Sequence, residues 1–124
     1  MEENQSEKIV IFATHGSEDP EKATIPFVIG NAALAMDVPV TIILQSGGVT
    51  LVQKGCYEHI VAPGFDPLQK LVGSFVELGG KLFVCIPCIE SRRITPDLLV
   101  EGSELVKAAR IVNEVLEAKA VLNY

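Results

Sequence analysis

Cys85 and Cys88, three positions apart, are the residues whose type and spacing in this sequence best suit chemistry. They follow a strand-like apolar run and precede a helix-like segment that carries Arg92 and Arg93. The N–H groups at a helix start and a nearby guanidinium both stabilise a thiolate, which is the nucleophilic form of cysteine. We therefore expect chemistry at sulfur, with a lowered pKa for either thiol.

A Cys-x-x-Cys pair has several possible uses. The pair can cycle between dithiol and disulfide in the manner of thioredoxin, and the spacing alone favours this redox use. Alternatively, one cysteine accepts a sulfane sulfur as a persulfide and passes it to the thiolate of another protein, which needs one exposed thiol in positive surroundings. A third possibility is a non-catalytic assembly module whose cysteines belong to the core.

Metal binding is a weak further alternative. A closed zinc site needs four ligands, and the other candidates are Cys56, His15 and His59, without a second Cys-x-x-Cys or a His-x-x-x-His pair. Cys56 is most simply a buried helical thiol, and His59 a helix-end or surface histidine. We expect no metal site.

Two polar loops follow other strand-like runs. His15 could hold an oxyanion or tune a thiolate, and Ser46-Gly47-Gly48 could present backbone N–H groups to an anion. The second loop matches neither a phosphate-binding P-loop nor a dinucleotide fingerprint, so we expect no nucleotide cofactor.

Length and composition restrict the class of protein. The 124 residues suit one domain, residues 1–124, which can bury roughly two thirds of its unfolded surface. The net charge of −6, with scattered basic groups, argues against nucleic acid and anionic membranes as partners. Because 48% of the residues are hydrophobic, a monomer would struggle to hide its apolar surface, and we expect a homo-oligomer.

The amino end and the cysteine count bear on location. Residues 1–8 are polar and acidic, unlike a secretion signal, and the richest apolar stretch, residues 25–36, is too short to span a bilayer. Three cysteines, an odd number, argue against a disulfide framework. We expect a cytoplasmic protein.

Strand-like and helix-like segments alternate along the chain. Strands are expected over residues 8–13, 38–44, 81–86 and 119–123, and helices over 21–36, 49–57, 67–78, 87–93 and 95–117. Asp66 is the expected cap of the third helix, and Leu105, Ala109, Val112 and Leu116 the apolar face of the last. The alternation predicts an α/β fold, a three-layer α/β/α domain with a mostly parallel four- or five-stranded sheet.

In such a sheet, ligands bind outside the carboxyl ends of the strands. We therefore expect residues 14–17, 45–48 and 85–88 to be neighbours at one edge.

The segment Leu-Phe-Val-Cys-Ile-Pro-Cys-Ile-Glu-Ser-Arg-Arg-Ile of residues 82–94, after Gly79-Gly80, resembles the DsrE/DsrF-like family. That family includes TusD-type sulfur-relay subunits and proteins labelled predicted peroxiredoxins. The resemblance extends through most of the chain, but only the cysteine region is specific. It implies a small α/β/α domain that forms trimers or hexamers and exchanges sulfur with donor and acceptor proteins.

The resemblance also suggests residue roles. The family's acceptor cysteine falls on Cys85, several residues before an Arg-Gly dipeptide whose glycine is replaced here by Arg93. From the residues themselves, we expect Cys88 to resolve or assist, Arg92 with the helix start to stabilise the anionic sulfur, and His15 to be a neighbour. The predicted function is sulfur transfer, with Cys85 as the persulfide-carrying nucleophile.

Overall fold

The computed structural model describes residues 7–124. Residues 1–6, which carry most of the polar segment used above to argue against a secretion signal, lie outside the described part. The elements are β1 (Ile9–Ala13), α2 (Pro20–Ala35), β2 (Val40–Leu44), η1 (Ser46–Val52), η2 (Tyr57–His59), α3 (Leu68–Glu77), β3 (Lys81–Cys85), α4 (Ile86–Ser91), η3 (Pro96–Leu98), β4 (Ser103–Val106), α5 (Ala108–Leu116) and β5 (Ala120–Asn123).

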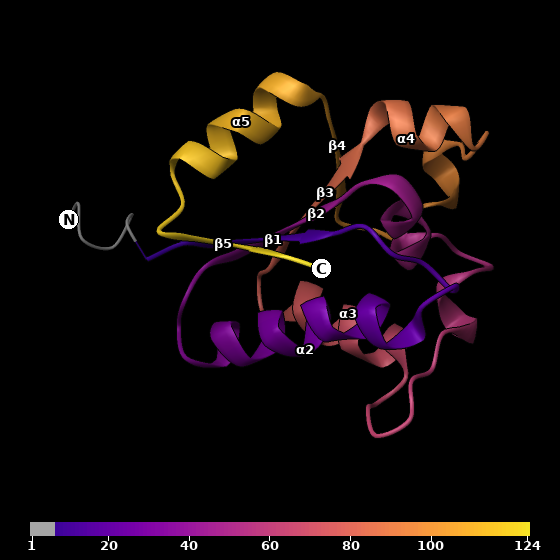
Figure 1. Cartoon of the computed structure of the whole chain (residues 1–124), viewed down its shortest axis with the longest axis horizontal. Coiled ribbons are helices and arrows are strands. Elements are labelled where there is room, and N and C mark those ends of the chain that lie inside the picture. Colours follow the sequence, from indigo (N-terminus) through magenta and orange to yellow (C-terminus); the bar gives the residue numbers. More distant parts are fainter. Residues whose placement is uncertain (1–6) are drawn as a thin grey trace.

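The middle layer is a five-stranded sheet in the order β4-β3-β2-β1-β5, and every pair is parallel. Helices α2 and α3 cover one face, and α5 crosses the other (Figure 1). The predicted α/β fold and parallel sheet are therefore confirmed. None of the helices within residues 7–124 is long and apolar enough to cross a bilayer.

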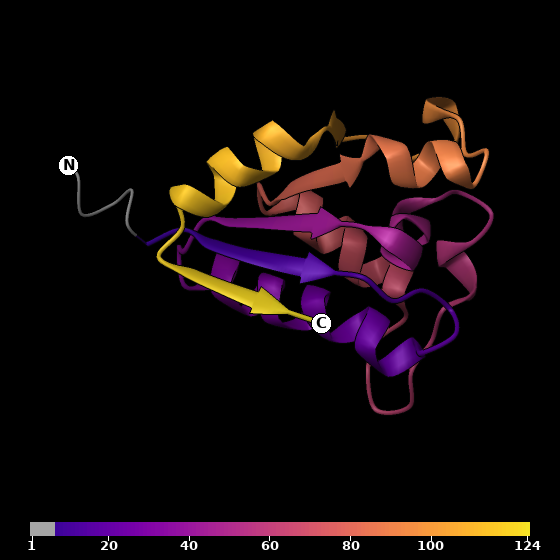
Figure 2. The same ribbon diagram turned by 45° about the horizontal axis from the view of Figure 1, so that its top comes forward.

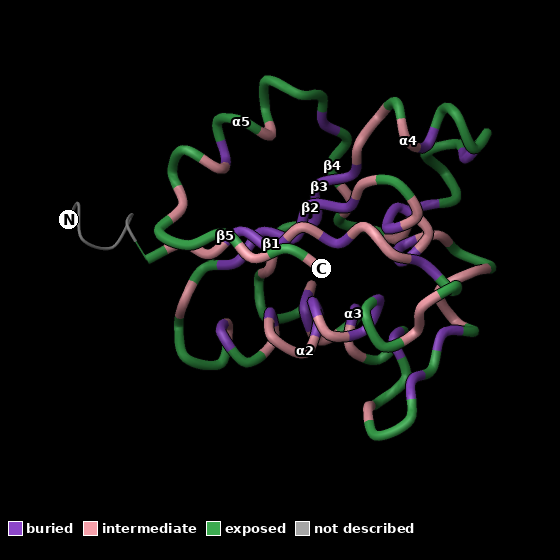
Figure 3. The backbone as a smooth tube through the Cα atoms, in the orientation of Figure 1, coloured by how far each residue is buried: buried purple, intermediate pink, exposed green. Residues whose placement is uncertain are grey.

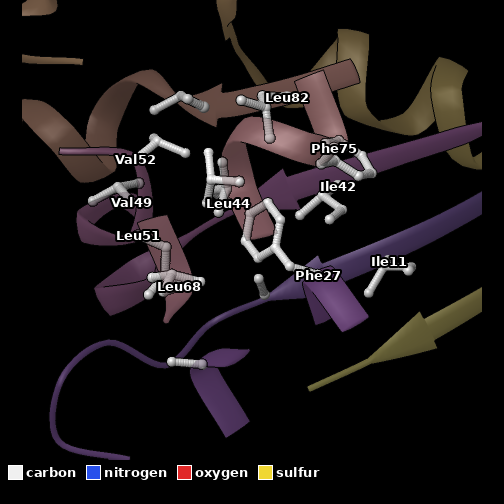
Figure 4. Close-up of a cluster of buried hydrophobic side chains, with 14 of the residues drawn as sticks. Ile11, Phe27, Ile42, Leu44, Val49, Leu51, Val52, Leu68, Phe75 and Leu82 are labelled. Atoms are coloured by element: carbon white, nitrogen blue, oxygen red, sulfur yellow. The ribbon is translucent and has the colours of Figure 1, made fainter. Parts of the chain in front are cut away.

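The larger core lies between the sheet and the α2/α3 layer (Figure 4). Phe27 and Phe75 meet edge to face there, with ring centroids 5.6 Å apart. A smaller cluster under α5 contains Val10, Ile43 and Phe83. Burial of strand residues on both faces explains why the strands have nearly continuous apolar sequences.

The predicted helix over residues 95–117 is wrong. The chain forms the short turn η3, then the edge strand β4, and only then α5. Of the four residues expected on one apolar face, Leu105 lies in β4, and the others lie on the outer side of α5, where Val112 is 56% and Leu116 76% exposed. Ile111 and Val115 pack on the sheet instead. Figure 3 shows this outer side of α5 as mostly exposed, in contrast to the buried strands.

Two other boundaries differ from expectation. Residues 49–57 form no α-helix. Residues 49–52 belong to the 3₁₀ turn η1, and Tyr57 begins the 3₁₀ turn η2. Pro67, and not Asp66, is the N-cap residue of α3, and the Asp66 carboxylate lies 3.6 Å from the Lys70 ammonium instead. The end of α3 is as predicted, because Gly79 adopts the left-handed conformation that closes the helix, with φ +93°.

A polar cluster lies on the α5 face of the sheet, around Glu114 near the start of the strands. The Glu114 side chain is 2% exposed, and its carboxylate accepts hydrogen bonds from the Thr41 hydroxyl and, at 3.1 Å, from the Lys8 ammonium. Arg110 Nη1 lies 3.8 Å from the same carboxylate, and its guanidinium carbon lies 4.8 Å from the Phe83 ring centroid. These contacts fasten α5 to β1, β2 and β3.

Candidate functional site

The carboxyl ends of the strands all point toward the end of the molecule that holds α4 and η1 (Figure 2). The backbone N–H of Ser46, which follows β2, donates a hydrogen bond to Cys88 Sγ at 3.2 Å. After β1, Gly16 lies so close to η1 that a Cβ there would be 2.9 Å from the Gly47 oxygen. The three segments expected to be neighbours are therefore in contact.

The two thiols are placed by the junction of β3 with α4. Cys85 is both the last residue of β3 and the N-cap residue of α4, with extended backbone angles of φ −68° and ψ 119°. Pro87 lies in the first helical turn, where its missing N–H costs nothing. Cys88 is the third helical residue and therefore follows Cys85 by about one turn.

The turn that closes α4 is formed without a glycine, where the resemblance suggested an Arg-Gly dipeptide. Arg93 adopts the left-handed conformation, with φ +56°. Its N–H bonds to the Glu90 oxygen at 3.1 Å, and the Ile94 N–H bonds to the Ile89 oxygen at 2.9 Å, which is the paired pattern that ends many helices. Ile89 and Ile94 are both buried, so apolar packing supports the non-glycine turn.

The N–H that reaches Cys88 comes from a constrained backbone. Ser46 has φ +53°, an uncommon conformation for a residue with a side chain, and sparsely populated conformations cluster at functional sites. Gly48 lets η1 lie against the end of β1, because a Cβ there would be 1.9 Å from the Ala13 oxygen. The Ser46-Gly47-Gly48 loop thus offers an N–H to sulfur, where the sequence suggested an anion ligand.

The Cys88 side chain is partly buried and packs against the larger core. Its sulfur accepts the Ser46 N–H, and negative charge on sulfur would strengthen that hydrogen bond. Arg92 Nη1 donates a hydrogen bond to the Cys88 carbonyl oxygen at 3.1 Å, and this contact with the backbone holds the guanidinium beside the thiol pair. Arg92 itself is exposed, which weakens its field through solvent screening.

Burial raises the pKa of the Cys85 thiol above its ordinary value, and the neighbouring Cys88 sulfur raises it further. The Cys88 backbone N–H and Arg92 act in the opposite direction but do not compensate. This differs from the expected lowering of the Cys85 pKa. The physical reason is that a six-residue helix and an exposed guanidinium supply little positive potential against desolvation.

The remaining candidates lie farther from this chemistry. His15 Nδ1 lies 3.4 Å from the Thr14 hydroxyl, in the loop after β1, and no hydrogen bond joins His15 to either thiol within the described residues. Cys56 is the N-cap residue of η2 and His59 is exposed at its end. Within residues 7–124, no group of three or more His, Cys, Asp or Glu side chains is arranged to hold a metal ion.

One residue near the site carried no signal in the sequence beyond its place in a loop. The Glu18 carboxylate accepts the Gly16 N–H through both oxygens, at 3.0 and 3.1 Å. These bonds lie within the loop that follows β1, and Gly16 of that loop lies close to η1, the turn that begins at Ser46.

The protein is a small parallel α/β/α domain with a thiol pair at the carboxyl end of its third strand, and by these features it belongs to the class of small cysteine-bearing α/β proteins. The model of the DsrE/DsrF-like family matches residues 7–124, and the chain belongs to that family.

One relative is an uncharacterized protein, MJ0760, of Methanocaldococcus jannaschii, which is 33% identical over 107 residues. The match takes in 86% of this chain but 39% of the relative, so the chain spans well under half the length of that protein.

Two solved structures share the fold. The YchN protein of E. coli superposes with a TM-score of 0.80 at 21% identity, over 95% of this chain and 99% of YchN. MTH1491 of Methanobacterium thermoautotrophicum, a protein of unknown function, gives 0.69 at 17% identity, over 94% and 98% of the two chains.

Proposed function

We propose that the protein is a sulfur carrier that receives sulfane sulfur as a persulfide on the Cys85/Cys88 pair. The observation that carries this proposal is the Ser46 N–H directed at Cys88 Sγ, with a second thiol one helical turn away. Membership of a family that includes sulfur-relay subunits supports the same function.

Within the pair, the geometry favours Cys88 as the sulfur that attacks the donor. Cys88 Sγ has a backbone donor that an anionic sulfur would use. Cys85, which the sequence favoured, has a raised pKa and therefore forms its thiolate less readily. Arg92 beside the pair would favour negative charge on either sulfur, and Gly47 would help to hold the η1 loop. His15 would be a more distant polar neighbour.

The test is uptake of sulfur from glutathione persulfide under anaerobic conditions. Sulfur taken from the donor is counted as protein-bound persulfide plus free sulfide. We expect uptake by the wild type and none by Cys85→Ser/Cys88→Ser. The matched control is Cys56→Ser, which removes the third partly buried thiol and should take up sulfur as the wild type does. Equal uptake by the double variant would exclude the pair as the carrier.

A dithiol/disulfide redox protein is the second candidate function, because both cysteines are unpaired and adjacent at the start of α4. That function needs only an oxidant and a reductant. A redox protein should lose both thiols reversibly when a disulfide reagent is added, and should take up no sulfur from a persulfide donor. A sulfur carrier should take up that sulfur.

We also propose that the protein self-associates through the outer side of α5. Val112 and Leu116 expose large apolar side chains there, and large exposed apolar patches mark interaction sites. The resemblance favours a trimer or hexamer. Light scattering should give the wild type a mass that is a multiple of the chain mass. The double variant Val112→Glu/Leu116→Glu should have a lower mass. The control is Met36→Glu, because Met36 is equally exposed, at 74%, but lies at the end of α2.

The other partners would be a sulfur-donor and a sulfur-acceptor protein, with neither nucleic acid nor membrane involved. A net charge of −6 without a clustered basic footprint supports this choice. Three unpaired cysteines suit the reducing cytoplasm, which remains the proposed compartment.

A further inference from the structure

We propose that the thiol pair discharges its own persulfide as hydrogen sulfide, with Cys85 attacking a persulfide carried by Cys88. This inference rests on the proposed function and gives the site a second activity, the reduction of sulfane sulfur. The products are a Cys85–Cys88 disulfide and sulfide, and an external dithiol would restore the pair.

The two thiols lie close together. Cys85 caps α4 and Cys88 is its third residue, so the two side chains are neighbours three positions apart at a helix start. Residues so spaced have Cα atoms on the order of 5 Å apart, inside the range of roughly 4.4–6.8 Å that disulfides span. The sulfurs are close enough for Cys88 to perturb the ionisation of Cys85. A persulfide on Cys88 would therefore have a thiol beside it before any acceptor protein arrived.

The two sulfurs also have different surroundings. Cys88 Sγ accepts the Ser46 N–H, a contact suited to an attacking thiolate. Burial and the Cys88 sulfur raise the Cys85 pKa, so Cys85 stays a protonated thiol while Cys88 reacts. The pair thus contains one nucleophile for the donor and one thiol that keeps its proton for the next step.

The first step loads the pair. The Cys88 thiolate attacks the outer sulfur of a donor persulfide, R–S–SH. A bond forms between Cys88 Sγ and that sulfur, the S–S bond of the donor breaks, and the persulfide proton leaves with the donor as R–SH. The product is an anionic persulfide on Cys88.

The second step releases sulfide. The Cys85 thiol gives its proton to the terminal sulfur of the persulfide, and Cys85 Sγ attacks the Cys88 sulfur. The Cys85–Cys88 bond forms, the bond to the terminal sulfur breaks, and HS⁻ leaves. The two cysteine sulfurs supply the two electrons that reduce the sulfane sulfur. No oxidant is needed, and a dithiol closes the cycle.

The test follows one equivalent of glutathione persulfide added anaerobically to the reduced full chain without reductant. For the wild type and Cys56→Ser, we expect about one sulfide per protein and a mass lower by about 2 Da, which dithiothreitol reverses. For Cys85→Ser, and for Cys85→Ala as a second variant, we expect a persistent gain of about 32 Da on Cys88 and at least about tenfold less sulfide.

Two outcomes would overturn the sulfide-release step and leave the carrier function standing. One is a wild type that keeps the added sulfur and releases no sulfide. The other is sulfide release from the Cys85 variants at the wild-type yield, which would mean that Cys85 is not the attacking group. If neither the wild type nor any variant consumes the donor, both the carrier function and the sulfide release are wrong.

Discussion

The two ends of the sheet surround their ionisable groups differently. Near the amino ends of the strands, the Glu114 carboxylate is buried, and Thr41, Lys8 and Arg110 all approach it. At the carboxyl ends, the Cys88 sulfur is only partly buried and accepts one backbone N–H. A buried charge needs several partners to remain ionised, and Glu114 has them.

The pKa directions express the same difference. Burial opposes the charge of Glu114, but the hydrogen bonds from Thr41 and Lys8 outweigh it, and the pKa of Glu114 lies below its ordinary value. At Cys85, burial also opposes the charge, and there the compensating groups do not prevail, so its pKa is raised. Desolvation opposes the charge at both ends, and the hydrogen bonds to the group decide whether it stays an ion, as at Glu114, or keeps its proton, as at Cys85.

The largest expected effect is on stability, from Glu114→Ala. The substitution leaves the buried Thr41 hydroxyl without an acceptor and Lys8 with only the exposed Glu117, and removing one partner of a buried pair costs about 3 kcal/mol. Urea denaturation measures the loss. The control is Glu117→Ala, which removes a carboxylate that also contacts Lys8 but is 65% exposed, and should cost under about 0.5 kcal/mol. Equal losses from both variants would contradict a structural role specific to Glu114.

The next prediction concerns the carboxyl end and the ionisation of Cys85. In Cys88→Ser, the neighbouring sulfur that helps to raise the Cys85 pKa is gone, so the pKa should fall while remaining raised by burial. Iodoacetamide alkylation of Cys85, followed by peptide mass spectrometry from pH 6 to 10, measures this. The midpoint should move to lower pH than in the wild type. An unchanged midpoint, with Cys56 alkylation as the internal reference, would mean that the two thiols do not interact.

A smaller effect is expected from Arg92→Gln. The guanidinium lowers the Cys85 pKa, more weakly than burial and the Cys88 groups act on it, and is held beside the pair through the Cys88 carbonyl oxygen. Because the group is exposed, its removal should slow sulfur uptake by about threefold at low salt and by less at high salt. The control is Arg93→Gln, which removes the same positive charge one residue farther along the chain. A loss that does not depend on salt would contradict an electrostatic role.

The sequence predicted the parts of the fold that depend on local patterns. The apolar runs of β1, β2 and β3 were recognisable because both faces of the sheet bury them. The meeting of the segments that follow these strands was predictable, because parallel strands bring their carboxyl ends to one edge. The thiol pair was found by its spacing alone.

What the sequence did not predict depends on partners far along the chain. The Ser46 N–H and Cys88 Sγ are 42 residues apart, and the Thr41 hydroxyl and Glu114 are 73 apart. Helix α5 has apolar residues on two sides, and the sequence does not say which one the sheet covers. The exposed side, with Val112 and Leu116, was therefore mistaken for the buried one. Strand β4 is a four-residue edge strand whose pairing with β3 defines it more than its composition does.

The smallest predicted effect concerns the backbone that closes α4. A left-handed residue with a side chain costs about 1 kcal/mol, and glycine removes that cost but gains freedom of similar size in the unfolded chain. Arg93→Gly should therefore change the free energy of unfolding by less than about 0.5 kcal/mol in urea, and leave sulfur uptake unchanged because the turn is kept. At the matching position of α3 the two terms do not cancel: Gly79 has φ +93°, beyond the left-handed well at about +50 to +70° that residues with a side chain occupy, so Gly79→Ala should cost about 1 kcal/mol net. A large loss of uptake in Arg93→Gly would show that the Arg93 side chain serves the thiols, and would move it from the fold of α4 into the site.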